Sequence, residues 1–368
     1  MEESKMFNVD EKYYQEFNGK VGQLFCYITS KCNTDCVQCL YKPLRSYSLL
    51  RDEINKEDML NLLAAYRKMG ALKTTFMGGE PTLHKDLPEI IRKSKELGYK
   101  YVRIDTNGLF DKSLLLNPDF KMLDEITFSL DDYDPQINDT IRGKNYFKKC
   151  VATINHAHEL GYKMHLTCCI HNQLTKRDES GKLRLDSMID FAESLHFETI
   201  NFHTLFKANI PRDSWTGNIH TSINEYLELI SEYFSNNEAL SQRKIKIRLP
   251  QGFTTKKEFS EEPEYFGYCC AKQRDRALLF PDGTIKVCSL MIGSTYYVAY
   301  YDKDGIHYND TPINELLSHA DGSSTPCTHQ LKKNMYSPYL PLCVSFKPKQ
   351  NELVWLEKLN WENKRKTK

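Results

Sequence analysis

Short β-rich runs alternate with amphipathic stretches between residues 21 and 203 of this 368-residue chain. The β-rich runs are Gly22–Thr29, Lys73–Met77, Lys100–Thr106, Glu125–Leu130, Lys163–Ile170 and Glu198–His203. Between them, apolar residues recur three or four positions apart, which predicts helices at Lys56–Met69, Asp86–Leu97, Tyr146–Leu160 and Asp186–Leu195. Glycines at the ends of three of these helices are typical C-terminal caps. The alternation predicts βα units around a parallel sheet.

Six βα units are too few for the eight-stranded barrel, so the fold class we predict is α/β, with an open or partial (β/α)6 barrel over residues 21–208. Its functional site is expected at the carboxyl ends of the strands. After about residue 209 the regular pattern fades. A helix is predicted near Ile223–Phe234, and Pro281-Asp282-Gly283 predicts the turn of a hairpin in the segment RALLFPDGTIKVC. Residues 209–346 are therefore predicted to form a small α+β extension, flanked by an N-terminal extension (1–20) and a basic tail (347–368).

Side-chain alternation within the strands predicts a polar inner face for the barrel. In the fourth run, Ile126, Phe128 and Leu130 share one face, which leaves Ser129 and Asp131 on the other. The same test places further polar or reactive side chains inward, namely Thr127, Arg103, Asp105, Asn107, His165, Thr167, Cys169, His171, Asn201 and His203. For each histidine, a hydrogen-bonded structural role is favoured over a catalytic one.

Composition and charge exclude several classes of protein. Fifty basic and 49 acidic residues leave a net charge of +1, which gives no electrostatic reason to expect a nucleic acid or membrane partner. The first residues lack the pattern of a signal peptide, and no apolar run approaches the 18 or so residues of a membrane span, so a cytoplasmic location is expected. The twelve cysteines are then expected to be reduced, as core residues, catalytic thiols or metal ligands.

The sharpest chemical signal is a loop with three cysteines directly after the first strand. Cys32, Cys36 and Cys39 are spaced x3 and then x2 in the segment CNTDCVQC. Three thiolates on a four-iron cluster leave one iron open for a small molecule, which is a catalytic arrangement. The alternatives are chance spacing among buried cysteines and structural zinc, although zinc usually has a fourth ligand and no histidine lies near this loop.

Together with Gly78-Gly79-Glu80-Pro81 after the second strand, this loop resembles the signature of the radical S-adenosylmethionine (SAM) superfamily. The resemblance continues through Thr106-Asn107-Gly108, Ser129-Leu130-Asp131 and Ile141-Arg142-Gly143, and covers residues 21 to about 205. It implies a [4Fe-4S] cluster on the three cysteines, with SAM chelated to the open iron. The SAM-binding residues that it implies are Gly78, Gly79 and Glu80 for the amino group, Ser129, Asp131 and Arg142 for the ribose and carboxylate, and Asn107.

One position departs from the family pattern. The residue before the third cysteine is usually aromatic in this superfamily, where it touches the adenine, whereas this chain has Gln38. Tyr41 is the aromatic residue that could take over this contact.

The resemblance also implies an activity. Reductive cleavage of SAM would give a 5'-deoxyadenosyl radical that abstracts hydrogen from a substrate, and the electron would come from an external donor of the flavodoxin or ferredoxin type. The substrate stays open between a peptide and a small sugar-like metabolite, to be oxidised, epimerised or cross-linked. The absence of a leader-binding module before Val21 slightly favours a small molecule or a separately supplied leader-binding protein. Cys169 could return a hydrogen atom, although a buried cysteine is more often inert. The alternative is a non-catalytic iron-sulfur or structural zinc scaffold.

The cysteines beyond residue 265 resemble the auxiliary-cluster extension called SPASM or Twitch, which holds a second [4Fe-4S] cluster beside a hairpin. The longer SPASM cysteine run is absent, so the shorter Twitch form is favoured. The ligands implied are Cys269, Cys288, Cys327 and Cys343, with Cys270 as an alternative to Cys269. A hairpin with scattered buried thiols is the competing interpretation.

Overall fold

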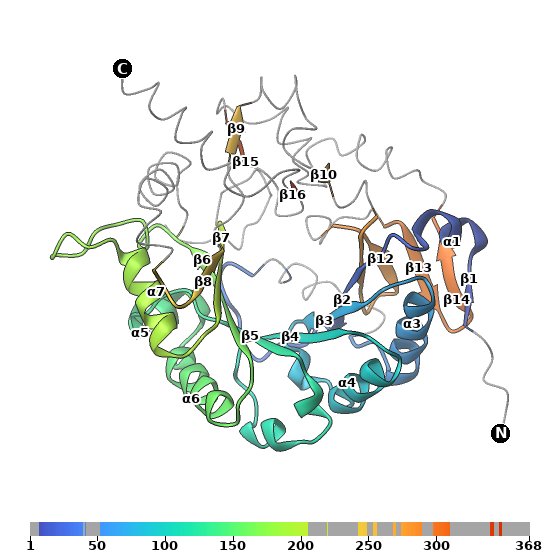
Figure 1. Ribbon diagram of the computed structural model, residues 1–368, viewed down its shortest axis with the longest axis horizontal. Helices are drawn as coiled ribbons and strands as arrows, with labels where there is room; N and C mark the ends of the chain where they lie inside the picture. The colour runs from blue at the N-terminus through green and yellow to red at the C-terminus, as the bar shows by residue number, and fades with distance from the viewer. Residues whose placement is uncertain are drawn as a thin grey trace.

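The computed structural model describes residues 7–39, 41, 52–204, 219, 242–248, 253–255, 268–269, 274–288, 297–309, 339–341 and 346–347. Most of its strands belong to one twelve-stranded sheet with the order β1-β14-β13-β12-β11-β2-β3-β4-β5-β6-β7-β8. The sheet bends into an arch whose two ends do not meet (Figure 1). The predicted α/β partial barrel is therefore confirmed.

The centre of the sheet consists of the six predicted strands, all parallel to their neighbours. They are β2 (Gln23–Thr29), β3 (Lys73–Gly78), β4 (Tyr101–Thr106), β5 (Glu125–Ser129), β6 (Met164–Ile170) and β7 (Thr199–Thr204). Because the strands are parallel, the loops that follow them meet along one edge of the sheet. The cysteine loop follows β2 and the Gly-Gly-Glu-Pro turn follows β3, so these two motifs are spatial neighbours.

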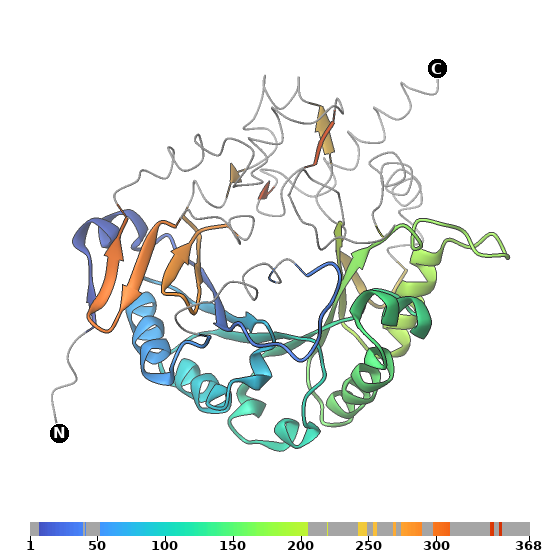
Figure 2. The same ribbon diagram turned by 180° about the vertical axis from the view of Figure 1, so that it is seen from behind.

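Helices cover the convex face of the arch (Figure 2). Four were predicted from sequence and are found as α3 (Lys56–Lys68), α4 (Leu87–Glu96), α6 (Tyr146–Glu159) and α7 (Arg184–Ser194). A fifth, α5 (Pro135–Arg142), was not predicted, and it ends at the arginine of the Ile141-Arg142-Gly143 motif. Three short 3-10 turns, η1 (Pro81–Leu83), η2 (Lys112–Leu116) and η3 (Phe120–Met122), complete the connections.

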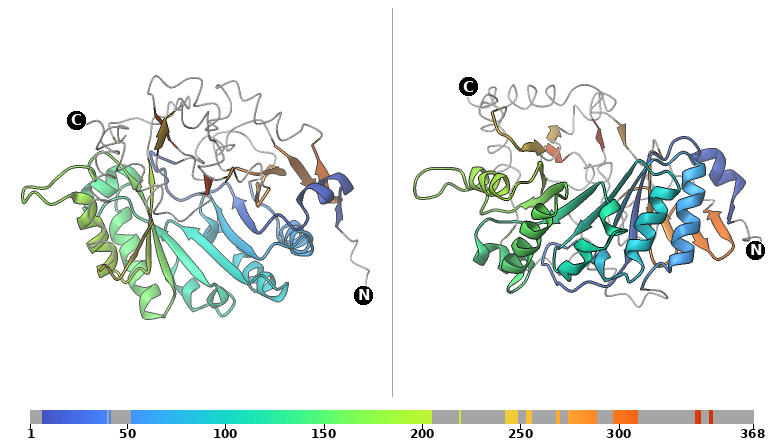
Figure 3. Two further views of the ribbon diagram at one scale, coloured as in Figure 1. Left: turned by 45° about the horizontal axis from the view of Figure 1, so that its top comes forward. Right: turned by 60° about the horizontal axis from the view of Figure 1, so that its bottom comes forward.

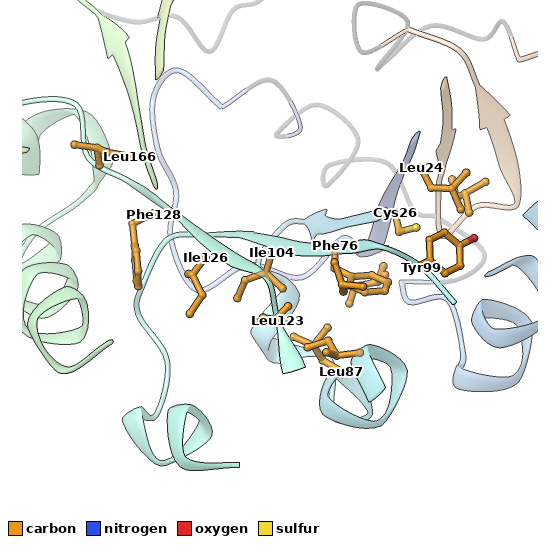
Figure 4. Packing of buried hydrophobic residues seen from close by; sticks show 14 of the residues in the cluster. Leu24, Cys26, Phe76, Leu87, Tyr99, Ile104, Leu123, Ile126, Phe128 and Leu166 are labelled. Atoms are coloured by element: carbon orange, nitrogen blue, oxygen red, sulfur yellow. The ribbon is translucent and has the colours of Figure 1, made fainter. Parts of the chain in front are cut away.

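The main hydrophobic core lies between the sheet and these helices. Figure 4 shows Ile104, Ile126, Phe128 and Leu166 projecting from neighbouring strands toward this core. Ile126, Phe128 and Leu130 are completely buried, as the alternation in the sequence predicted. Each such side chain stabilises the fold by about 1.5–3 kcal/mol, so the outward face of β5 is fixed and its polar inner face follows.

The sheet extends beyond the six predicted strands on both sides. On one side, β8 (Lys246–Arg248) pairs parallel with β7. On the other, β11 (Arg276–Leu279) pairs parallel with β2 and begins an antiparallel run through β12 (Thr284–Lys286), β13 (Ala299–Asp302) and β14 (Gly305–Tyr308). The hairpin predicted around Pro281-Asp282-Gly283 is thus present, and it continues the barrel sheet.

The N-terminal segment closes this same end of the sheet. Strand β1 (Asn8–Val9) pairs parallel with β14, and α1 (Glu11–Phe17) packs beside it (Figure 3). Gly305 is required at this junction, because a Cβ there would lie 2.2 Å from the carbonyl oxygen of Asn8. Residues 8–17 are therefore an integral part of the sheet edge.

Two further strand pairs lie outside the large sheet. They are β9 (Phe253–Thr255) with β15 (Tyr339–Pro341), and β10 (Tyr268–Cys269) with β16 (Phe346–Lys347). The helix predicted near Ile223–Phe234 and most of the basic tail lie outside the described residues. The domain boundaries at residues 20, 208 and 346 stay predictions. In the part of the chain that the structure describes, no helix is both long and apolar enough to cross a bilayer.

Candidate functional site

The cysteine loop and the Gly-Gly-Glu-Pro turn are joined backbone to backbone. Gly79 N donates to the Thr29 carbonyl and Glu80 N donates to the Lys31 carbonyl, each at 2.7 Å. A Cβ on Gly78 would lie 2.3 Å from the Thr29 oxygen, and one on Gly79 would lie 2.0 Å from the Lys31 oxygen. Only glycine permits this approach, so the two glycines fix where the cysteine loop begins.

Glu80 braces the turns after β3 and β4 from inside the protein. Its side chain is 1% exposed and accepts four hydrogen bonds. Three come from Thr82 N (3.1 Å), Thr82 Oγ1 (2.7 Å) and Thr106 Oγ1 (2.7 Å), and the fourth from Asn107 N (2.7 Å). Burial raises the pKa of Glu80, while these donors act in the opposite direction. The carboxylate thus holds the loops together, and its oxygens point into the protein.

Cys32 and Cys36 lie on two sides of one hydroxyl group. Their Sγ atoms are 3.2 Å and 3.6 Å from Thr34 Oγ1. Cys36 is buried and Cys39 is partly exposed, following a turn in which Cys39 N donates to the Cys36 carbonyl at 3.3 Å. Burial raises the pKa of the Cys36 thiol, and the nearby Arg142 guanidinium lowers it.

The loop is anchored on one side by the end of β4 and on the other by the end of α5. Asn107, which follows β4, donates from Nδ2 to Asn33 Oδ1 at 2.6 Å and lies 3.9 Å from Cys32 Sγ. On the other side, Val37 N donates to the Ile141 carbonyl at 3.0 Å, and Cys36 Sγ lies 3.6 Å from the Arg142 carbonyl. Asn107 and Arg142, both predicted to bind SAM, lie far apart in the sequence, yet both border the cysteine loop.

This donor set fits an iron-sulfur cluster with one open corner. Three thiols come from one eight-residue loop that is pinned at both ends. The Asn107 amide donates toward Cys32 Sγ, and the Thr34 hydroxyl contacts the Sγ atoms of both Cys32 and Cys36. Hydrogen bonds to cluster sulfurs are one of the means by which proteins tune such clusters. Among the described residues, no three His, Cys, Asp or Glu side chains are gathered around a position for a single ion.

Asp131 and Arg142 contact each other in a buried ion pair. Arg142 Nε lies 2.7 Å from Asp131 Oδ2, and Nη2 donates to Oδ1 at 3.1 Å. Although burial acts against the charge of Arg142, Asp131 raises its pKa well above the ordinary value. Asp131 also accepts from Cys169 N at 2.8 Å and from the Gln38 side chain. Ser129, at the end of β5, is partly exposed, and its carbonyl accepts from Tyr146 Oη at 2.8 Å.

The predicted inner histidines are hydrogen-bonded. His165 Nδ1 lies 2.7 Å from Glu125 Oε1, and His171 Nε2 lies 3.2 Å from Asp132 Oδ2. His203 pairs with Asn201 at 3.1 Å, and burial lowers its pKa. These partners agree with the structural role favoured from sequence.

Arg103 and Asp105 form a further ion pair on the inner face, at 2.9 Å. Cys169 keeps some exposure to solvent, but most of its thiol is surrounded by protein. This burial raises the pKa of the thiol well above the ordinary value, so the thiol remains protonated at neutral pH.

Sequence reasoning missed the role of Gln38 and the surroundings of Tyr41. The Tyr41 ring stacks on Tyr27 (centroids 5.2 Å apart), which in turn stacks on Phe280, the residue after β11 (4.5 Å). This stack connects the cysteine loop to the added side of the sheet. The departure from the family pattern at position 38 was the signal, but the sequence could not show that Gln38 would contact Asp131.

Of the predicted auxiliary-cluster cysteines, only Cys288 is described with its side chain. It is 7% exposed at the end of β12. Cys39 and Cys288 both lie close enough to Tyr27 to add to the rise in its pKa, which burial dominates. Cys269 belongs to β10, whereas Cys270, Cys327 and Cys343 lie outside the described residues.

A family model described as the radical SAM superfamily matches residues 26–180, the part of the chain that carries all of the site geometry above. Residues 26–180 form a radical SAM domain. This confirms the resemblance inferred from the two motifs, and members of this superfamily use a [4Fe-4S] cluster and SAM.

Curated relatives are similar over part of the chain. GTP 3',8-cyclase of Psychromonas ingrahamii is 32% identical over 164 residues, which cover 43% of this chain and 47% of the relative. Molybdenum cofactor biosynthesis protein 1 of Drosophila melanogaster is 26% identical over 269 residues, covering 71% and 45%. The chain thus spans about half the length of these two relatives.

Solved structures of radical SAM enzymes share the fold over more of the chain. Streptococcus suis SuiB bound to its precursor peptide SuiA has a TM-score of 0.62 at 17% identity, covering 91% of this chain and 78% of SuiB. The enzyme anSMEcpe with bound AdoMet has a TM-score of 0.62 at 14% identity, covering 94% and 98%. At these identities the likeness concerns the fold.

Proposed function

We propose that this chain is a radical SAM enzyme whose Cys32, Cys36 and Cys39 hold the SAM-cleaving [4Fe-4S] cluster. The observation that supports this most strongly is the backbone junction between the cysteine loop and the Gly78-Gly79 turn, which leaves no room for a side chain. Such a junction places the proposed cluster ligands beside the proposed site for the SAM amino group. A scaffold with purely structural cysteines has no need of it.

When bound, the cluster and SAM supply reductive cleavage of SAM and a 5'-deoxyadenosyl radical that abstracts hydrogen from a substrate. The chain's own residues would hold and orient the cluster and SAM. Gly78 and Gly79 offer backbone groups at the end of β3, and Asn107 steadies the cysteine loop from the end of β4. Glu80 acts as a brace, because its carboxylate accepts four hydrogen bonds from the turns after β3 and β4, three on Oε1 and one on Oε2.

We place the substrate against the polar inner face of the barrel. The Arg103–Asp105 and His165–Glu125 pairs and the amide of Asn201 face this side, which suits a polar metabolite with several hydrogen-bonding groups. The named relatives include a GTP 3',8-cyclase, which agrees with a small polar substrate. A peptide is the second candidate, because SuiB has the same fold and was solved with a precursor peptide.

A second [4Fe-4S] cluster is proposed on Cys288 together with Cys269 or Cys270, Cys327 and Cys343. Cys288 supports this assignment, since it is a buried thiol that directly follows the predicted hairpin. We further propose that electrons arrive from a flavodoxin or ferredoxin in the cytoplasm, where reduced thiols persist.

Anaerobic reconstitution followed by measurement of 5'-deoxyadenosine from SAM under reduction tests the proposal. Wild type should form this product, and Cys36→Ala should lose it together with the iron of one cluster, about four atoms. Cys26→Ala is the matched control, because Cys26 is buried in the hydrophobic core between the sheet and the helices. This variant should keep the iron content of the wild type. Product formation by Cys36→Ala would contradict the proposal.

Iron content then separates one cluster from two. About eight irons per chain would support the second site, and about four would refute it while leaving the first assignment intact.

A further inference from the structure

Gln38 occupies a buried position at the centre of the candidate SAM site. It lies between Cys36 and Cys39 in sequence, and its side chain is 6% exposed. Its amide nitrogen donates to Asp131 Oδ2, while its carbonyl oxygen is buried and has no hydrogen-bond partner among the described residues. A buried carbonyl without a donor costs free energy, so a partner is expected from a bound molecule.

The carboxylate of Asp131 is engaged by the protein on both oxygens. Oδ1 accepts from Cys169 N and from Arg142 Nη2, and Oδ2 accepts from the Gln38 amide and forms an ion-pair contact with Arg142 Nε. Of the roughly four lone-pair positions of a carboxylate, three are therefore taken by hydrogen bonds, and the Arg142 guanidinium lies against the oxygen that has the fourth. A ribose hydroxyl of SAM would compete at Asp131 Oδ2 with this guanidinium, whereas the Gln38 carbonyl oxygen has no competing partner among the described residues.

This pairing also fixes which way the Gln38 amide is turned. An ionised carboxylate only accepts hydrogen bonds, so the nitrogen of the amide must face Asp131 and the oxygen must face away. Gln38 thus presents an unpaired acceptor beside the Asp131 carboxylate, held in place next to the end of β5 where Ser129 lies.

We propose that the Gln38 carbonyl accepts a hydrogen bond from a ribose hydroxyl of SAM, in the role that the family resemblance gave to Asp131. This inference rests on the proposed function, since it assumes that SAM binds here. The SAM ammonium is directed to the open iron in that proposal, which leaves the two ribose hydroxyls and the adenine amino group as donors. The ribose is favoured because Gln38 is anchored to Asp131, beside Ser129.

The test is the binding of SAM and of its 2'-deoxy and 3'-deoxy analogues to cluster-loaded protein by equilibrium dialysis. Wild type should bind one deoxy analogue about tenfold more weakly than SAM, the effect of one lost hydrogen bond. Gln38→Met should bind SAM about tenfold more weakly and should no longer distinguish that analogue from SAM. Iron content and melting temperature, recorded in parallel, separate this loss from damage to the cluster.

Gln23→Met is the matched control, because Gln23 begins β2 and its amide contacts Thr75 at 3.4 Å. It should keep the wild-type affinities and the tenfold discrimination.

Two results would overturn the inference. If Gln38→Met keeps the tenfold discrimination between SAM and the deoxy analogue, another residue recognises the sugar. If wild type instead discriminates only against an analogue whose adenine amino group is replaced by oxygen, the Gln38 carbonyl accepts its hydrogen bond from the adenine. If cluster-loaded wild type binds no SAM, the proposed function itself is refuted. If it binds SAM, the comparison with the deoxy analogues tests the role of Gln38 alone.

Discussion

Replacing Glu80 by glutamine tests whether this residue braces the loops or contacts SAM. Four protein donors converge on the two oxygens of Glu80, which are one hydroxyl and one N–H from Thr82, the Thr106 hydroxyl and Asn107 N. Glutamine has one oxygen and one NH2 group. If its oxygen keeps the three donors on Oε1, its NH2 faces the N–H of Asn107, and both are left without an acceptor.

The cost follows from these contacts. A hydrogen bond to a charged group contributes about 1.5–3 kcal/mol, and leaving a buried donor unpaired costs about 1–3 kcal/mol. The neutral amide recovers part of this, because burial opposes the charge of Glu80, as its raised pKa indicates. We therefore expect Glu80→Gln to lower the free energy of unfolding by about 3 kcal/mol, which at about 2 °C per kcal/mol lowers the melting temperature by about 6 °C.

The assay is thermal unfolding of the protein without iron or SAM, so that no bound cofactor contributes. Glu89→Gln is the matched control, since Glu89 is an exposed carboxylate on α4 that pairs with Lys56, and this substitution should leave the melting temperature close to that of wild type. Should Glu80→Gln leave the melting temperature within about 1 °C of wild type but weaken SAM binding to the loaded protein, the bracing role is wrong and the side chain contacts SAM.

Three further predictions follow from the described contacts. Gly79→Ala should destabilise the protein by more than about 3 kcal/mol and prevent cluster loading, because the added Cβ would lie 2.0 Å from the Lys31 oxygen. Gly22→Ala is the control, because its Cβ would meet its nearest atom at 3.9 Å. This control variant should unfold at nearly the wild-type urea concentration. Burial lowers the pKa of His203 below its ordinary value of 6.5. As the pH drops below this value, the unfolded chain binds more protons than the folded protein, so the free energy of unfolding decreases as the pH is lowered. His203→Gln should flatten this fall in urea midpoints measured between pH 7 and pH 5, and an unchanged slope would assign it to other groups. Because Cys169 stays a thiol, Cys169→Ala should keep SAM cleavage but lose deuterium transfer from solvent to product, and retained deuterium would exclude Cys169 as the hydrogen donor.

The sequence was sufficient for the centre of the fold, because side chains such as Phe128 and Leu166 repeat with the period of a buried parallel strand. It was not sufficient for short elements. Helix α5 has only eight residues and β8 only three, so neither carries enough periods to stand out from a loop. The pairing of β11 with β2 joins residues far apart in sequence, and no local pattern encodes it.

The candidate site shows the same division. Motif spacing located the cysteine loop and the Gly78-Gly79 turn, because close backbone contact demands these residue types at these positions. Spacing could not reveal which way Glu80 points, or that Asp131 would pair with both Arg142 and Gln38, because those contacts depend on where three loops meet. The residues near a ligand were predictable, whereas the direction of each polar side chain was not.

The parallel pairing of β2 with β11 has a consequence for how the protein is made. Strand β2 leaves the ribosome early, but the partner that covers its outer edge, Arg276–Leu279, is synthesised only near the end of the described chain. At about 5–20 residues per second, the backbone donors and acceptors along that edge stay open for tens of seconds. An open strand edge is a site for pairing with other chains. The nascent protein should therefore depend on chaperones, or aggregate, until its late hairpin arrives.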